Sequence, residues 1–213
     1  MKIGILGGGQ LGRMFIQNAL NYDDEFHVLD PNADCSCAYI AHFSQGNFND
    51  YENVLAFGQD KDVISIEIEH VNVDALFELE KQGKKVIPNA EIIKTIQQKI
   101  LQKEFYKKHN IPSPDFEIFD GTSDEIKIKF PFVQKLNTGG YDGKGVQIIK
   151  NAEDLKNLWT EDSVLENLVD IDKELSIIIA KNENGETKTF PVTEMVADEK
   201  LNLLDFNICP ADI

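Results

Sequence analysis

The chain has 213 residues, 42% hydrophobic and 27% charged, and its 37 acidic against 21 basic residues give a net charge of −16. This composition is typical of a soluble globular protein with one large domain or two small ones. It argues against a nucleic-acid or anionic-membrane partner, which would need a cationic footprint, and no stretch nears the roughly 18 apolar residues of a transmembrane helix.

The first part of the chain alternates short apolar runs with amphipathic segments. The apolar runs predict β-strands at 2–6, 26–29, 63–66 and 85–87, and the amphipathic segments predict helices at 10–20, 51–57 and 73–80. This alternation favours an open parallel sheet with helices on both faces. Ligands of such sheets bind beyond the carboxyl ends of the strands, where residues 7–12, Asp30 and residues 67–70 would lie.

Three glycines follow the first predicted strand with a recognised spacing. Gly7, Gly9 and Gly12 fit the pattern G-x-G-x-x-G before a predicted helix, and Asp30 stands 18 residues beyond Gly12. Backbone amides at such a helix start bind phosphate. By itself this pattern is a dinucleotide fingerprint, so a nicotinamide-dependent oxidoreductase is one alternative.

A single long helix is predicted over residues 91–109, and Pro112 and Pro114 end it. We place a domain boundary there and expect three domains: 1–110, 111–168 and 169–213. In the last of these, strands are predicted at 174–181 and 187–192, joined by a turn at 182–185, and at 201–206.

The most informative segment is 135–145, which reads KLNTGGYDGKG between predicted strands at 132–135 and 146–149. Its four glycines allow backbone amides to turn inward and form an anion-binding concavity. Lys135 and Lys144 add positive charge. The segment therefore predicts a flap that closes over a polyphosphate.

This flap resembles the phosphate-covering loop of ATP-grasp enzymes, and the whole chain resembles the N5-carboxyaminoimidazole ribonucleotide synthase family. The other landmarks that carry the resemblance, in family order, are residues 7–14, 67–71, 88–90, 102–103, 174–176 and 210–211. The resemblance implies an α/β ATP-grasp fold with an N-terminal Rossmann-like open parallel sheet, a small α+β flap domain and the start of a third α+β domain.

The resemblance also implies a reaction. Members of the family use ATP and bicarbonate to carboxylate 5-aminoimidazole ribonucleotide in purine biosynthesis, through carboxyphosphate. Two further alternatives stay open: another ATP-grasp ligase, such as the formate-dependent glycinamide ribonucleotide transformylase, and a nucleotide-binding module without enzymatic activity.

Site residues follow from the same resemblance. Asp142 and Lys144 are the expected catalytic residues, with Asp142 accepting the amine proton. The ribonucleotide is expected at Gly9, Gln10, Leu11, Glu67 and Tyr141. ATP is expected at Lys99, Lys135, Gly140, Tyr141, Asp142, Gly143, Lys144, Gly145, Val146, Glu166, Asn167, Leu168, Val169 and Glu174.

Family members continue well beyond position 213, so we expect the chain to stop inside its third domain and to be inactive by itself. Magnesium is an expected cofactor, with its ligands in that continuation and none within this chain. We also expect a homodimer in the cytoplasm. Cys35 and Cys37 are too close for an ordinary disulfide and Cys209 is distant, as fits a reducing compartment.

Overall fold

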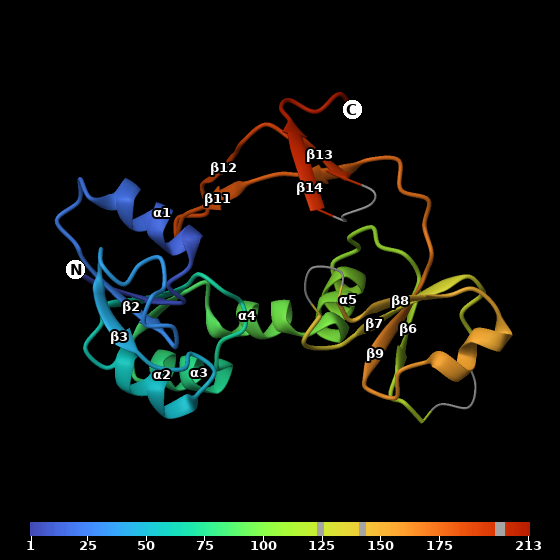
Figure 1. Cartoon of the computed structure of the whole chain (residues 1–213), viewed down its shortest axis with the longest axis horizontal. Helices are drawn as coiled ribbons and strands as arrows, with labels where there is room; N and C mark the ends of the chain where they lie inside the picture. The colour runs from blue at the N-terminus through green and yellow to red at the C-terminus, as the bar shows by residue number, and fades with distance from the viewer. Residues whose placement is uncertain (123–125, 141–143, 199–202) are drawn as a thin grey trace. The chain divides into compact units, whose positions relative to one another are not determined.

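The computed structural model describes the chain except for residues 123–125, 141–143 and 199–202. The chain forms two compact units, Met1–Leu168 and Val169–Ile213, each with its own sheets (Figure 1). Among the described residues, no helix is long and apolar enough to cross a membrane.

The first unit begins with a five-stranded sheet in the order β3-β2-β1-β4-β5, with every neighbouring pair parallel. Its strands are β1 (Lys2–Leu6), β2 (Glu25–Asp30), β3 (His42–Gln45), β4 (Val63–Ile66) and β5 (Lys85–Ile87). The predicted open parallel sheet is confirmed. Strand β3 was not predicted, because its sequence HFSQ carries no apolar run and it lies at the sheet edge.

Helices cover both faces of this sheet. They are α1 (Gln10–Ala19), α2 (Tyr51–Gly58), α3 (Val73–Lys81) and α4 (Ala90–Gln97). Successive residues of a strand point to opposite faces. Leu6 accordingly packs in a core with residues of α2 and α3, whereas Ile5 packs in a second core with Ile16 of α1. Two apolar layers therefore hold the sheet between its helices.

The single helix predicted over 91–109 is wrong. The structure has two helices, α4 and α5 (Lys99–Lys108), and between them Gln98 is extended at φ −122° and ψ 113°. Asn137 supplies the reason, since its carbonyl accepts the amide of Lys99 at 2.9 Å and its side-chain oxygen accepts the amide of Ile100 at 3.0 Å. A residue far along the chain thus caps α5 and stabilises the break.

The first unit also contains a four-stranded antiparallel sheet in the order β6-β9-β7-β8. Its strands are β6 (Phe116–Phe119), β7 (Phe132–Leu136), β8 (Val146–Ile149) and β9 (Ser163–Asn167), and a 3₁₀ helix, η1 (Ala152–Asn157), precedes β9. The strand pair predicted on either side of the glycine-rich segment is confirmed as β7 and β8. A separate core of Phe119, Phe132, Ile149 and Leu165 supports this sheet.

The second unit has a three-stranded antiparallel sheet of β10 (Glu174–Ser176), β13 (Thr193–Asp198) and β14 (Leu203–Ile208). A hairpin of β11 (Ile179–Lys181) and β12 (Thr187–Thr189) turns where the sequence predicted. The strand predicted over 174–181 is split, because β10 pairs with β13 while β11 pairs with β12. The division into domains 1–110, 111–168 and 169–213 stays a prediction.

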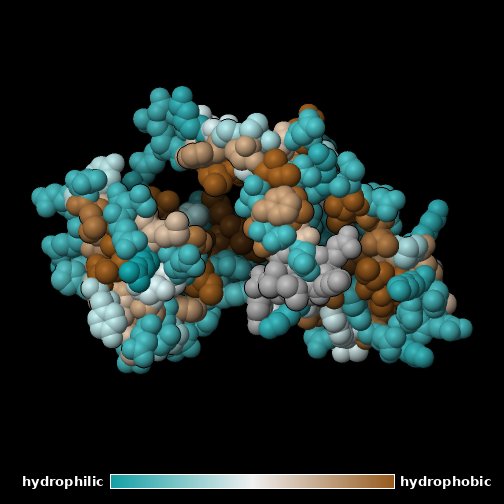
Figure 2. Space-filling model, turned by 45° about the horizontal axis from the view of Figure 1, so that its top comes forward, coloured by the Kyte–Doolittle hydropathy of each residue, from teal (hydrophilic) through white to brown (hydrophobic). Residues whose placement is uncertain are grey.

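Hydrophilic side chains cover much of the surface seen in Figure 2, with apolar patches between them. Of the second unit's described residues whose exposure is given, none is buried. Large apolar side chains are exposed there, among them Ile178, Phe190 and Phe206. The described part of this unit therefore has no apolar core like those of the first unit.

Candidate active site

The loop after β1 lies against the carboxylate of Glu67. Leu6 pairs with Ile66 in the parallel ladder, so Gly7 and Glu67 follow at adjacent carboxyl ends of the sheet. A Cβ atom placed on Gly9 would lie 2.5 Å from the Glu67 Oε1 atom. A side chain at position 9 would therefore displace this carboxylate from its present position. The structure thus brings together two residues predicted to bind the ribonucleotide.

A pocket of about 200 Å³ opens beside this loop and is lined in part by Leu11, Gly12, Ser65 and Glu67. Leu11 is exposed in the first turn of α1, next to Gln10, which is also exposed. Gly9, Gln10, Leu11 and Glu67, the described residues predicted to bind the ribonucleotide, therefore lie at the carboxyl edge of the parallel sheet, at the start of a helix that favours an anion.

Asp30 and Cys37 contact the same loop. The Gly8 amide donates to Asp30 Oδ2 at 2.8 Å, and the Asn32 amide donates to the other carboxylate oxygen at 2.8 Å. The Cys37 thiol lies 3.6 Å from the Gly9 carbonyl, and burial raises the pKa of Cys37 to about 11. Cys37 is therefore an uncharged side chain packed against the loop. Asp30, which was predicted to lie near this loop, holds it through the Gly8 amide.

A second group of charged residues lies where α5 covers the antiparallel sheet. Glu166 of β9 forms ion pairs with Lys135 of β7 and Lys103 of α5, and only 4% of Glu166 is exposed. Lys103 also donates to the Ser113 hydroxyl at 2.7 Å and lies over the Phe116 ring, 5.8 Å from its centroid. Lys135 keeps 32% of its side chain exposed. It can therefore reach a ligand while Lys103 cannot.

The charges of this group leave a surplus of one positive charge. Burial by itself would raise the pKa of Glu166, but the hydrogen bonds and charges of Lys103 and Lys135 outweigh burial and hold it below its ordinary value. The carboxylate is therefore ionised at neutral pH and compensates one of its two lysines. The remaining charge favours an anion beside Lys135.

Lys99 meets the glycine-rich segment at the start of α5. Its Cε atom lies 3.8 Å from where a Cβ atom of Gly140 would be. The two ends of the segment also meet, since the Gly145 carbonyl accepts the Leu136 amide at 2.9 Å and Gly145 has φ +71°. Lysine, glycine backbone and helix start thus converge, which is the arrangement that binds phosphate.

The remaining predicted residues are placed as follows. Tyr141, Asp142 and Gly143 lie outside the described residues. Lys144 and Val146 are exposed, and the Asn167 amide donates to the Asp115 carbonyl at 3.0 Å. Leu168 is exposed at the end of the first unit, and Val169 and Glu174 are exposed in the second.

Sequence reasoning missed the site roles of Lys103 and Asn137. A signal for Lys103 existed, because it stands four residues after Lys99 and such residues share one face of a helix. Asn137 had no such signal, since its partner Ile100 lies 37 positions away in the sequence.

Comparison with known proteins gives two family matches that together span most of the chain. Residues 1–97 match the ribonucleotide synthetase preATP-grasp domain, and residues 104–213 match the ATP-grasp domain. The N5-carboxyaminoimidazole ribonucleotide synthase of Staphylococcus aureus strain COL is 35% identical over 222 residues, covering 99% of this chain and 58% of that protein.

Solved structures agree. The Staphylococcus aureus N5-carboxyaminoimidazole synthetase complexed with ADP is 32% identical with a TM-score of 0.90, over 100% of this chain and 58% of that one. The Aspergillus clavatus synthase in complex with ADP and 5-aminoimidazole ribonucleotide is 30% identical with a TM-score of 0.80, over 93% and 54%.

This chain thus spans a little over half the length of these relatives. The predicted α/β ATP-grasp fold is confirmed, and the nicotinamide alternative is not favoured. The chain belongs to the ATP-grasp family, in the branch of the N5-carboxyaminoimidazole ribonucleotide synthases.

Proposed function

We propose that the protein carrying this chain uses ATP and bicarbonate to convert 5-aminoimidazole ribonucleotide into N5-carboxyaminoimidazole ribonucleotide. The observation that best supports ATP binding is the surplus positive charge of Lys103, Glu166 and Lys135 beside the Lys99 contact with the glycine-rich segment. The Aspergillus relative, solved with ADP and this ribonucleotide, supports the choice of substrates.

The reaction has two steps. A bicarbonate oxygen attacks the γ-phosphorus, the bond to the β-phosphate oxygen breaks, and ADP leaves carboxyphosphate behind. The ribonucleotide amine then attacks the carboxyphosphate carbon and phosphate leaves. Lys99, Lys135 and Lys144 neutralise phosphate charge, as positioning and electrostatics dominate phosphoryl transfer. Asp142 accepts the proton that the amine loses.

The two substrates are assigned to two groups of residues that share Tyr141. The ribonucleotide is assigned to Gly9, Gln10, Leu11, Glu67 and Tyr141. The triphosphate is assigned to the glycine-rich segment from Gly140 to Val146 and the adenosine half to residues 166–168, while the contacts of Val169 and Glu174 with the nucleotide stay predictions.

Magnesium would supply further neutralisation of the phosphates when bound. Among the described residues of this group, the carboxylate is Glu166, and it already forms ion pairs with Lys103 and Lys135. Glu166 does not fit as a magnesium ligand in this state. The steps above are accordingly assigned to the lysines, the flap and Asp142.

We also infer a homodimer in the cytoplasm. The free cysteines at 35, 37 and 209 fit a reducing compartment. Sedimentation of the purified protein tests the dimer, and a monomer at every concentration would contradict it.

The test of the reaction is ADP release by the protein that carries this chain at its full natural length. Release should require ATP, bicarbonate and 5-aminoimidazole ribonucleotide together, and the product should be the carboxylated ribonucleotide. ADP release that ignores the ribonucleotide would disprove the assignment. A gain with formate in place of bicarbonate, and glycinamide ribonucleotide as acceptor, would point to the transformylase instead.

Asp142→Asn tests the proton acceptor within the same assay. It keeps the size of the side chain and removes its basicity, so the carboxylation rate should fall by about 10²–10⁴-fold while ATP affinity changes little. Equal losses in rate and in ATP affinity would instead indicate a flap that no longer closes.

A further inference from the structure

Two histidines and a glutamate gather at the opposite end of the parallel sheet from the candidate active site. Glu25 is the first residue of β2, His27 stands two positions later, and His42 is the first residue of β3. In a parallel sheet these positions are at the amino ends of the strands, whereas Gly7 and Glu67 follow the carboxyl ends of β1 and β4. The cluster is therefore separate from the proposed nucleotide chemistry.

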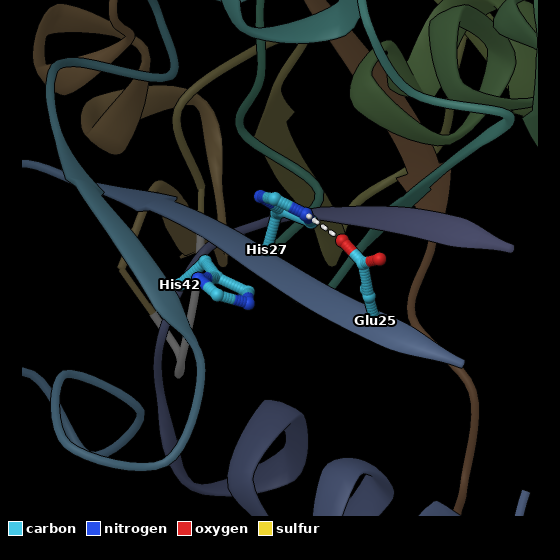
Figure 3. Close-up of side chains that lie close together, drawn as sticks. All are labelled: Glu25, His27 and His42. Atoms are coloured by element: carbon cyan, nitrogen blue, oxygen red, sulfur yellow. Dashed lines mark ion pairs between the residues drawn. The ribbon is translucent and has the colours of Figure 1, made fainter. Parts of the chain in front are cut away.

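The strand register brings the three side chains to one face. His27 pairs directly with His42, and residues two apart on a strand share a face, so Glu25 joins them. Their potential ligand atoms all lie within 4.8 Å of one another. Figure 3 shows Glu25 and His27 on one strand and His42 on its neighbour. Two imidazoles and a carboxylate are a donor set that suits first-row transition metals.

The buried nitrogen of His27 has no hydrogen-bond partner among the described residues. The Glu25 Oε2 atom lies 3.6 Å from this nitrogen, which is too long for a hydrogen bond. A buried polar atom without a partner is costly. A metal ion between Glu25, His27 and His42 would satisfy this nitrogen.

Lys61 is a positively charged residue near His27. Lys61 does not leave an uncompensated charge beside the site, because it forms an ion pair with Asp60.

Small side-chain rotations would bring the three ligand atoms close enough together to bind one metal ion. The two histidine rings are stacked, 4.7 Å between centroids and tilted by 25°. Metal–ligand bonds of about 2.0–2.2 Å hold ligand atoms within roughly 4.4 Å of one another. Glu25 and His42 are exposed, so they can rotate toward His27 and an ion can enter from solvent.

We propose that Glu25, His27 and His42 form a binding site for a divalent first-row transition metal, with Zn²⁺ as the test ion. No metal ligand was predicted in this chain, and these three residues are spread over 18 positions without a recognised spacing. The ion would tie the edge strand β3 to β2. This site is independent of the proposed carboxylation.

The experiment uses the chain purified without a polyhistidine tag, stripped with a chelator and titrated with Zn²⁺ by calorimetry. Wild type should bind one ion, and Zn²⁺ should raise its melting temperature. His42→Gln and Glu25→Gln change exposed residues, so they should fold and bind at least about tenfold more weakly. His109→Gln, which changes a histidine outside the cluster, should bind like wild type.

The absorption spectrum of bound Co²⁺ distinguishes this site from a site formed by the cysteines. Co²⁺ bound by imidazole and carboxylate lacks the charge-transfer absorption of a cobalt thiolate. A thiolate spectrum, absence of Zn²⁺ uptake by wild type, or equal affinity in wild type and His42→Gln would each overturn the proposal.

Discussion

Lys135 and Lys103 share one carboxylate but differ in what they can do. Lys135 is partly exposed, whereas Lys103 is nearly buried and also held by Ser113. A half-exposed lysine presents its charge to a ligand, and a buried one fixes the geometry of its partner. The two residues therefore divide binding and positioning between them.

Lys135→Ala in the protein that carries this chain should weaken ATP binding. Loss of one charge-assisted phosphate contact costs on the order of 1.5–3 kcal/mol, and calorimetric titration with ATP measures it. Lys107→Ala removes an exposed lysine of α5 and serves as the control. Equal ATP affinity in wild type and Lys135→Ala would place Lys135 outside the nucleotide site.

Glu166→Gln should lower the free energy of unfolding in a pH-dependent way. The pKa of Glu166 lies below its ordinary value of 4.5, so its ionised form stabilises the fold above that pH. At neutral pH the variant should lose about 3 kcal/mol, since a buried pair loses a partner. Below pH 4.5 the difference should shrink as the wild-type carboxylate takes up a proton.

Urea unfolding of both proteins at neutral and acidic pH measures this difference. Glu104→Gln, which changes an exposed residue of α5, is the control and should alter the free energy of unfolding by no more than about 0.5 kcal/mol. A Glu166→Gln difference that stays constant with pH would mean that the ion pairs do not stabilise the fold.

At the scale of elements, the start of α5 depends on the loop that follows strand β7 of the antiparallel sheet. Asn137 caps this helix from the loop that follows β7, and its own amide donates to the Asp162 carbonyl at 2.8 Å. The helix that carries Lys99 and Lys103 is thereby attached to the strand that carries Lys135. One asparagine therefore helps to fix the positions of three lysines of the candidate site relative to one another.

Asn137→Ala should therefore destabilise the protein and weaken ATP binding together. The lost side-chain cap costs about 0.5–2 kcal/mol of unfolding free energy. Asn72→Ala is the matched control, because Asn72 caps α3 through the Ala75 amide at 2.9 Å. It should cost similar stability and leave ATP affinity unchanged. If Asn137→Ala also leaves ATP affinity unchanged, the helix cap does not position the ATP site.

At the scale of the whole molecule, the two units differ in how they are stabilised. The first unit has apolar cores on both faces of its parallel sheet and a third under its antiparallel sheet. The second unit has no buried residue among those described with an exposure. Strands without an apolar core are marginally stable in water.

Hydrogen exchange on the 213-residue chain should reflect this difference. Amides of β1 and β4 should exchange slowly, by global unfolding, whereas those of β13 and β14 should exchange through local opening and many-fold faster. Exchange read out by mass spectrometry resolves these segments. Equal protection of β14 and β1 would show that another surface covers the second unit.

The sequence by itself determined the parallel sheet, the flap strands and the family. Mostly apolar runs such as Val63–Ile66 can be recognised without a distant partner, because buried parallel strands are rich in apolar residues. The glycines and lysines of 135–145 likewise predict phosphate binding from neighbouring residues alone. The residues predicted for the ribonucleotide, Gly9 and Glu67, then meet in the structure because parallel strands place their carboxyl ends together.

Tertiary structure alone decided the features that join distant segments. The break at Gln98 depends on Asn137, the ionised state of Glu166 depends on lysines from two other elements, and the cluster at His27 depends on the register of β3, which carries no apolar signal. In each case the free energy comes from a cap, an ion pair or a strand pairing between residues far apart in sequence. The local sequence pattern shows only which secondary structure a segment favours, and contacts between distant residues can override that preference.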